Sequence, residues 1–346
     1  MEKTGNYSTD KPSQADKVVE ITDRLEQGIK ELFESEKYKN YLKVMSRFHN
    51  YSFNNTLLIA MQRPNATYVA GYTSWERNFG RHVRKGEKGI RILAPSPYKI
   101  DKDVEKIDPK TRKPIIGQDG QPLKERVQVT IPAYKVTTVF DIAQTEGKEL
   151  PEIVTDLKED VEDYGRFLDA IVEASPVPVE FVQMGGSIHG YFNLEDRRIA
   201  IREGMSQQQT LKTCIHETAH AILHDRDSGT EKDNMPDSHT KEVQAESVAY
   251  TVCQHFGIDT SDYSFGYVAG WSKGRELEEL KASMNTIRKT AADIINSIQK
   301  NLDKAKEQTM EKVQEQAKAA GQTIILKPES KLVLEGARLR VHERHH

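Results

Sequence analysis

Cysteine is scarce in this sequence, in which Cys214 and Cys253 are the only two among 346 residues. So sparse a pair excludes a disulfide framework and indicates a reducing compartment. Both thiols suit burial as small apolar side chains, and a zinc-ligand role is disfavoured for either.

The sequence also lacks an apolar segment long enough to cross a membrane, and residues 1–16 contain no apolar core of a signal peptide. We therefore expect a cytoplasmic protein without a membrane partner. An excess of one charge is missing too, because 50 Lys and Arg residues face 53 Asp and Glu residues, for a formal net charge of -3. Any attraction to nucleic acid must therefore be local. The length allows two domains, each with its own core.

A His-Glu-x-x-His pattern lies within the segment Thr213–His224. On a helix, His216 and His220 project from one face, where two imidazoles can hold one metal ion. Glu217 lies one position further round and can act as general base on a metal-bound water. An ordinary solvated helix is the alternative, but an apolar stripe on the same segment indicates a packed one. The stripe consists of Leu211, Ile215, Ala219, Ile222 and Leu223.

Two histidines do not complete a zinc site, which commonly takes three protein ligands. A version with a third His six residues after His220 is excluded, since Arg226 stands there. Downstream, Glu242 and Glu246 share a face of a second amphipathic helix. One of them can ligate the metal while the other accepts a ring N–H from a ligating histidine. The alternative is a surface helix with two solvated glutamates.

Three further histidines follow the motif. His224 extends the row by one turn, and we expect it either to support a ligand or to lie at the surface. His239 and His255 have no such spacing and are expected to be structural.

A basic segment between Tyr68 and Leu93 predicts a strand, a short helix, a turn with glycines and a second strand. Its cations and interleaved aromatic rings suit single-stranded nucleic acid, because cations hold phosphates and rings stack on unpaired bases. The alternative, equally supported by these residues, is a charged hairpin with Trp75 in the core. The candidate nucleic-acid-binding residues are Trp75, Arg77, Arg81, Arg84, Lys85, Lys88 and Arg91.

The rest of the N-terminal half predicts a small α+β domain. Apolar spacing favours helices over residues 15–36 and 38–63, with a break near 49–52. Residues 101–126 are charged and rich in turn formers, which predicts an excursion between strands, and residues 127–140 alternate as a strand does. An acidic run up to Asp163 marks the expected domain boundary.

The second half predicts the scaffold of the metal helix. A helix over 164–174 and strands near 179–182, 191–192 and 198–201 precede it. An antiparallel edge strand beside the helix would let a peptide dock by strand addition. Residues 277–298 carry apolar side chains at alternating three- and four-residue spacing, which indicates one long helix.

Two segments together resemble a known family. Trp75 to Arg91 is similar to the N-terminal single-stranded-DNA-binding domain of ArdC-type antirestriction proteins. The His-Glu-x-x-His segment, together with the downstream glutamates, resembles the zincin-like metallopeptidase domain that follows in that family. That domain is related to the ImmA/IrrE peptidases. The resemblance spans about residues 16–300. It implies His216, His220 and Glu242 as Zn²⁺ ligands, Glu217 as general base and Glu246 as the partner of a ligating imidazole.

The leading hypothesis is an antirestriction-type protein of a mobile genetic element, of α+β class and with two domains. Residues 16–148 would bind single-stranded DNA and residues 149–300 would form the zinc metallopeptidase-like domain, between a disordered tail (1–15) and a charged C-terminal segment (301–346). One alternative is a regulatory zinc peptidase that cleaves a repressor or host protein. Another is a single-stranded-DNA-binding protein whose zinc fold is only structural. The sequence identifies neither a protein substrate nor an oligomeric state.

Overall fold

The computed structural model describes residues 12–118, 120–150, 161–225 and 236–319. These contain a mixture of helices and strands, which confirms the α+β class, and they fall into two compact units. Unit 1 comprises residues 1–26 and 91–138, and unit 2 comprises residues 27–90 and 139–346.

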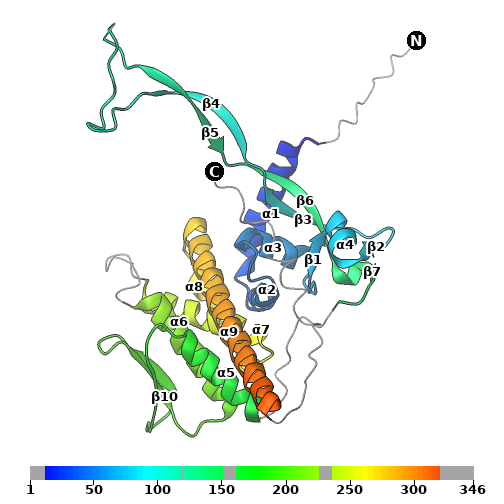
Figure 1. Ribbon diagram of the computed structural model, residues 1–346, viewed down its shortest axis with the longest axis vertical. Coiled ribbons are helices and arrows are strands. Elements are labelled where there is room, and N and C mark those ends of the chain that lie inside the picture. The colour runs from blue at the N-terminus through cyan, green and yellow to red at the C-terminus, as the bar shows by residue number, and fades with distance from the viewer. Residues whose placement is uncertain (1–11, 119, 151–160, 226–235, 320–346) are drawn as a thin grey trace. The chain divides into compact units, whose positions relative to one another are not determined.

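The elements can be followed in Figure 1. The helices are α1 (Gln14–Leu32), α2 (Ser35–Arg47), α3 (Phe53–Gln62), α4 (Tyr72–Phe79), α5 (Val161–Ala174), α6 (Gln207–His224), α7 (Ser238–His255), α8 (Val268–Ser272) and α9 (Leu277–Ala319), with a 3₁₀ turn η1 (Ile142–Gln144). The strands are β1 (Val69–Gly71), β2 (Arg81–Val83), β3 (Ile90–Pro95), β4 (Tyr98–Glu105), β5 (Lys124–Ile131), β6 (Tyr134–Asp141), β7 (Thr145–Gly147), β8 (Val179–Val182), β9 (Gly190–Asn193) and β10 (Arg198–Arg202).

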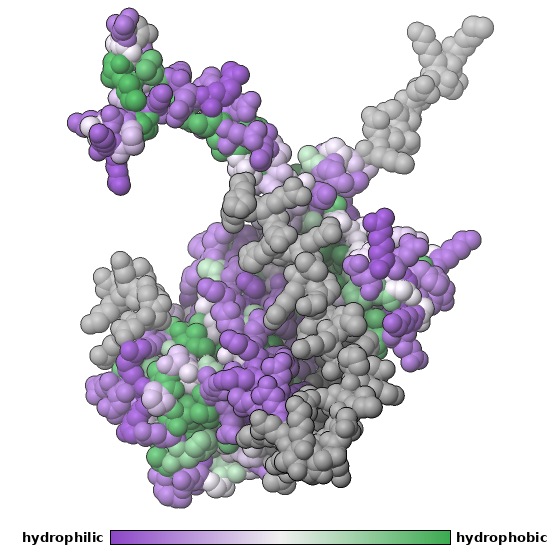
Figure 2. Space-filling view, viewed as in Figure 1, coloured by the Kyte–Doolittle hydropathy of each residue, from purple (hydrophilic) through white to green (hydrophobic). Residues whose placement is uncertain are grey.

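A long antiparallel hairpin, β4–β5, dominates unit 1 and extends beyond the neighbouring strands β3 and β6 (Figure 1). Its register runs from Tyr98 opposite Ile131 to Glu105 opposite Lys124. The sequence predicted a turn-rich excursion between strands over 101–126. Residues 106–123 do lie between β4 and β5, and the two strands extend into the predicted range at 101–105 and 124–126. Apolar side chains alternate along one face of the pair, and Figure 2 shows apolar surface on this hairpin. Of these side chains, Tyr98 is 53% exposed.

The core of unit 2 is helical and unites segments from both halves of the sequence. Helix α2 packs on α7, where the Tyr38 hydroxyl lies 2.8 Å from Ser247 Oγ. The ring of Tyr38 is fully buried and meets Phe265 edge-on, and Phe33 meets Trp271 in the same way. Phe265 and Trp271 therefore pack in the core of unit 2. The break between α2 and α3 also lies where it was predicted.

Helix α9 packs along α5 and α7, as expected of a long helix with one apolar seam. Its side chains Met284, Ile287, Ala291 and Ile298 are fully buried. Within the residues that the structure describes, no helix is both long and apolar enough to span a membrane.

A three-stranded sheet in the order β8–β10–β9 completes the part of unit 2 that surrounds the His-Glu-x-x-His segment. Strand β10 runs parallel to β8 and antiparallel to β9, and α6 packs on β9 and β10. The three predicted strands and the antiparallel edge strand beside α6 are therefore present.

The two units differ in their bounds from the predicted sequential domains. Residues 27–90 belong to unit 2 because α2 and α3 pack on α7 and α9. Residues 1–11, part of the predicted tail, and residues 320–346, part of the predicted C-terminal segment, lie outside the described residues.

Candidate metal centre

Helix α6 is the platform of the site. It begins at the N-cap Ser206, whose hydroxyl accepts a hydrogen bond from the Gln209 N–H at 3.2 Å. Strand β9 approaches it closely at Gly190. A Cβ atom at that position would lie 2.7 Å from Thr213 Cγ2 and 3.0 Å from the Ala200 carbonyl oxygen. Glycine therefore permits the edge strand to lie directly against the helix that carries the motif.

Three side chains converge in the way that one metal ion requires. Their candidate ligand atoms all lie within 4.8 Å of one another, and the side chains are His216, His220 and Glu242. The two imidazole Nε2 atoms are 3.1 Å apart, and Glu242 oxygens lie 3.8 Å from His216 Nε2 and 3.5 Å from His220 Nε2. Nitrogen and oxygen ligands about 2.0–2.2 Å from a tetrahedral zinc ion are themselves roughly 3.3 Å apart. The donor set therefore fits zinc.

The electrostatics favour the protonation states that ligate a metal. Burial, and then the charge of neighbouring His220, lower the pKa of His216 to about 4. The pKa of Glu242 is lowered as well, chiefly by His220, whose Nε2 lies 3.5 Å from a Glu242 oxygen. At neutral pH, His216 is therefore a neutral imidazole and Glu242 an ionised carboxylate, as ligands must be.

Glu217 lies beside the three converging side chains and is only 8% exposed. Burial raises its pKa, while a hydrogen bond from the Phe192 backbone N–H on β9 partly opposes that rise. A carboxylate with a raised pKa next to a candidate metal position is suited to accepting and then releasing a proton.

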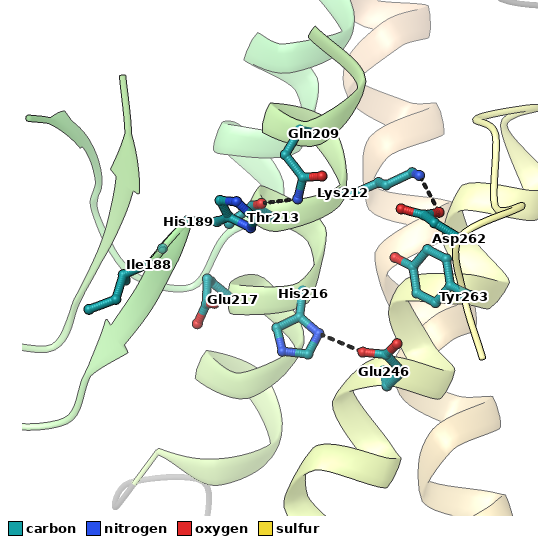
Figure 3. Close-up of a pocket in the computed structure, with 11 residues that line it drawn as sticks. Ile188, His189, Gln209, Lys212, Thr213, His216, Glu217, Glu246, Asp262 and Tyr263 are labelled. Carbon is teal, nitrogen blue, oxygen red and sulfur yellow. Dashed lines mark hydrogen bonds and ion pairs between the residues drawn. The ribbon is translucent and has the colours of Figure 1, made fainter. Parts of the chain in front are cut away.

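Glu246 faces the other nitrogen of His216. The Glu246 Oε2 atom lies 3.8 Å from His216 Nδ1. Burial is the largest cause that raises the pKa of Glu246, and the charge of Glu242 raises it further. In Figure 3, His216 lies between Glu217 and Glu246. Of the two glutamates on α7, Glu242 thus faces the Nε2 atoms of His216 and His220, and Glu246 faces the opposite side of the His216 ring.

His224 lies against the far side of His220 and is held there by Gln244 and Ser283, two residues that the sequence did not point to. His220 Nδ1 lies 3.0 Å from His224 Nδ1, and His224 Nε2 lies 3.2 Å from Gln244 Oε1. Gln244 Nε2 donates to Ser283 Oγ on α9 at 3.0 Å. Burial lowers the pKa of His224 to about 4, so this imidazole is neutral. Its role is therefore internal, and the predicted surface alternative for it is excluded.

A polar pocket of about 300 Å³ opens next to these groups (Figure 3). Its wall includes His216, Glu217 and Glu246 on one side and Gly190 at the start of β9. Lys212 also lines it and forms an ion pair with Asp262 at 2.6 Å. A peptide lying along β9 would pass this pocket.

The predicted nucleic-acid-binding residues have different environments. Trp75 is fully buried and donates through Nε1 to the Phe140 carbonyl at 2.9 Å, so its ring cannot stack on a base. The structure therefore contradicts the prediction that the Trp75 ring binds nucleic acid. Arg81 and Arg84 bond to the backbone of β7 and η1, at 3.1 Å to the Thr145 carbonyl and 2.6 Å to the Ala143 carbonyl.

The remaining four cations also differ. Arg91, in unit 1, forms a bidentate ion pair with Glu20 at 2.8 and 3.0 Å. Arg77, Lys85 and Lys88 are exposed, and within the described part of the chain their side chains form no hydrogen bond or ion pair, although the Lys88 carbonyl accepts from Gln144 Nε2 at 2.8 Å. These three cations are available for phosphates.

Comparison with known proteins finds two family models on the chain. One describes the N-terminal domain of anti-restriction factor ArdC and matches residues 14–140, and the other describes the IrrE N-terminal-like domain and matches residues 175–256. The uncharacterised protein pXO2-81 of Bacillus anthracis is 30% identical over 330 residues, which cover 86% of this chain and 54% of that protein. DNA primase TraC of Escherichia coli is 37% identical over 68 residues, 20% of this chain and 6% of the primase. The chain thus spans about half of the first relative and a small part of the second.

Two crystal structures of the antirestriction protein ArdC from plasmid R388 are also similar. The metal-free structure has 22% identity and a TM-score of 0.44, with 73% of this chain and 86% of that one covered. The Mn(II)-bound structure has 20% identity and a TM-score of 0.46, with 82% and 97% covered.

Proposed function

Because the chain belongs to the ArdC-type antirestriction family by its two matched domains, we propose that it binds single-stranded DNA and hydrolyses peptide bonds at a zinc site. One observation carries the proposal: two imidazoles and a carboxylate converge beside buried Glu217 at a pocket next to an edge strand. The role that follows is protection of incoming single-stranded DNA against restriction.

We assign His216, His220 and Glu242 as the zinc ligands, and Glu246 as the carboxylate that orients His216 through its Nδ1. A zinc ion held there would activate a water molecule and polarise a peptide carbonyl. Glu217 accepts the proton of the attacking water and passes it to the leaving amine, which its raised pKa favours. A substrate in extended conformation pairs with the free edge of β9, as peptides do with exposed sheet edges.

Replacement of Glu217 by Gln tests the hydrolytic part. We expect zinc and DNA binding to persist, because Glu217 is not among the ligands. Hydrolysis of labelled casein, used as a general protein substrate, should fall by roughly 10²–10⁴-fold, the usual contribution of a general base. Glu195→Gln, at an exposed carboxylate in the β9–β10 turn, is the matched control and should hydrolyse casein normally.

The same pair of variants distinguishes the alternatives in cells that restrict incoming plasmid DNA. If Glu217→Gln protects as well as the native chain does, the zinc fold is structural and the peptidase proposal fails. If protection is lost and a discrete cleavage product of a host protein disappears with it, the regulatory peptidase is supported instead.

DNA binding is proposed to depend on Lys85 and Lys88 at the turn between β2 and β3, with Arg77 on α4 contributing. Arg81, Arg84 and Arg91 already bond within the protein, so we assign them secondary contacts. The test is fluorescence anisotropy of the full chain on single- and double-stranded oligonucleotides across a salt series. We expect tighter binding to single strands.

A double Lys85→Ala and Lys88→Ala variant should lower the salt slope for single strands by about one to one and a half, since each phosphate contact contributes roughly 0.7. Lys300→Ala combined with Lys306→Ala removes two exposed lysines of α9 and serves as the matched control. An equal loss of affinity in both double variants would exclude the turn as a specific binding surface.

A further inference from the structure

A chain of buried polar groups runs from the back of His220 to helix α9. It consists of His220, His224, Gln244 and Ser283, with successive distances of 3.0, 3.2 and 3.0 Å. His224 is 4% exposed, and Gln244 and Ser283 are each 7% exposed. Three elements, α6, α7 and α9, contribute to it, so its geometry is fixed by the core of unit 2.

The hydrogen-bond donors along this chain follow in order from Gln244. Its NH₂ group donates to Ser283, so its Oε1 faces His224 and can only accept. His224 Nε2 must therefore carry the hydrogen, and in a neutral imidazole Nδ1 is then an acceptor. His220 Nδ1 must donate to it, which leaves the lone pair of His220 Nε2 directed at His216 and Glu242.

We propose that His224 and Gln244 are positioning residues that fix His220 in the tautomer required for metal ligation. This inference rests on the metal site of the proposed function and deepens it. Metal ligands of this kind are ordinarily oriented by a carboxylate or a backbone carbonyl. Here a second imidazole, one helical turn away, takes that place and links the site to α9.

The opposite order of donors gives the opposite outcome. If the amide of Gln244 turned over and Ser283 donated to it, His224 would donate from Nδ1 and His220 would carry its hydrogen on Nε2. That nitrogen could not then bind a metal. The tautomer of His224 in the zinc-bound protein therefore decides whether the relay works as proposed.

Zinc affinity of the full chain, measured by competition with a chromophoric chelator, tests the energetic consequence. Gln244→Met keeps the size of the side chain and removes its acceptor, so we expect zinc affinity to fall 10- to 100-fold. Gln244→Glu restores an acceptor for His224 Nε2, with Ser283 able to donate to its second oxygen, and should stay within a few-fold of the native value. Ser247→Ala, at a buried hydroxyl one turn along α7 that contacts Tyr38, is the matched control and should leave zinc affinity unchanged.

Nitrogen-15 NMR of the histidine rings provides a readout that a merely structural role would not move. In the zinc-bound native chain we expect His224 in the Nε2–H form and His220 in the Nδ1–H form. A His224 ring protonated on Nδ1, or a Gln244→Met variant that binds zinc as tightly as the native chain, would overturn the relay while leaving the metal site intact. Failure of the native chain to bind zinc at all would remove both the relay and the proposed zinc centre.

Discussion

Glu242 and Glu246 lie one turn apart on α7, yet their environments differ in a way that their spacing does not reveal. The side chain of Glu242 is 63% exposed, and its oxygens face both Nε2 atoms. That of Glu246 is 31% exposed and faces His216 Nδ1. The first position suits a ligand reached from solvent, and the second suits a group that orients a ligand.

Substitution of each glutamate by Gln should separate these roles. Glu246→Gln leaves three ligands in place, so we expect zinc affinity to fall by at most the roughly 10- to 100-fold that loss of an orienting group costs. Glu242→Gln removes a charged ligand and should lower affinity further than that. Chelator competition on the full chain measures both. The reverse order would mean that Glu246, and not Glu242, completes the site.

At the residue scale, spacing alone predicted that His216 and His220 lie together in the candidate metal centre. Histidines four apart on a helix share a face whatever surrounds them, so His216 and His220 needed no tertiary information. Gln244 and Ser283 could not be found in this way, because their partners lie 20 and 39 residues away and a single Gln or Ser carries no periodic signal. Trp75 was misjudged for a related reason: a tryptophan among cations looks the same in sequence whether its ring is buried or exposed.

At the scale of elements, two half-buried histidines meet where the segment after α2 lies against the end of α7. The ring centroids of His49 and His255 are 4.8 Å apart, and His255 Nδ1 donates to the Ser46 carbonyl at 2.7 Å. Burial, and then the charge of His255, lower the pKa of His49 to about 4, and burial lowers that of His255. The folded state therefore favours neutral rings at this contact.

Acid should weaken this contact. The unfolded chain binds protons near pH 6.5, the ordinary histidine pKa, whereas folded His49 does so only near pH 4. The contribution of His49 to the free energy of unfolding is fully present above about pH 6.5. It falls as the pH drops from about 6.5 to about 4, and it changes no further below about pH 4. Between pH 7 and 4.5 the loss should be about 1 to 3 kcal/mol.

Urea unfolding of native, His49→Phe and His239→Phe chains across this pH range measures the effect. His49→Phe should remove that loss of about 1 to 3 kcal/mol from the pH dependence of the unfolding free energy. The control His239→Phe, at an exposed histidine, should leave the pH dependence unchanged. Equal pH profiles for all three chains would contradict the assigned burial of His49.

The hairpin β4–β5 shows where element prediction reached its limit. Charged and turn-forming residues between 101 and 126 dominated the signal, although Tyr98, Ile100 and Val104 alternate on one face. Alternation identifies a strand only when polar and apolar residues separate clearly, and here Lys102 interrupts the apolar face. The helices had no such interruption, so their positions were predicted well.

At the scale of the whole molecule, order along the chain does not determine which segments share a core. Family models place two domains in sequence, at 14–140 and 175–256, whereas α2 and α3 belong to the unit that holds the metal centre. Side chains of α2 contact residues more than 200 positions away, as between Tyr38 and Ser247. Such pairings leave no local trace in sequence.

This arrangement implies that a fragment of residues 14–148 should not fold as the same segment does in the full chain. Without α7 and the segment that follows it, the Tyr38 hydroxyl loses Ser247 and its ring loses the contact with Phe265. Burial of one large apolar side chain stabilises a fold by about 1.5–3 kcal/mol, against a total stability of roughly 5–15 kcal/mol. We expect the fragment to bind the dye ANS, to be cut rapidly by trypsin within α2 and to unfold without a sharp transition.

Addition of a separate fragment of residues 161–319 provides the control, since it supplies α7 and α9 and should suppress both dye binding and cleavage in α2. A 14–148 fragment that unfolds cooperatively and excludes the dye on its own would contradict the shared core. DNA binding by that fragment would then report on a separable domain. If the shared core holds instead, α2 links the N-terminal segment directly to the helix that carries Glu242, so DNA and zinc affinities must be measured on the full chain.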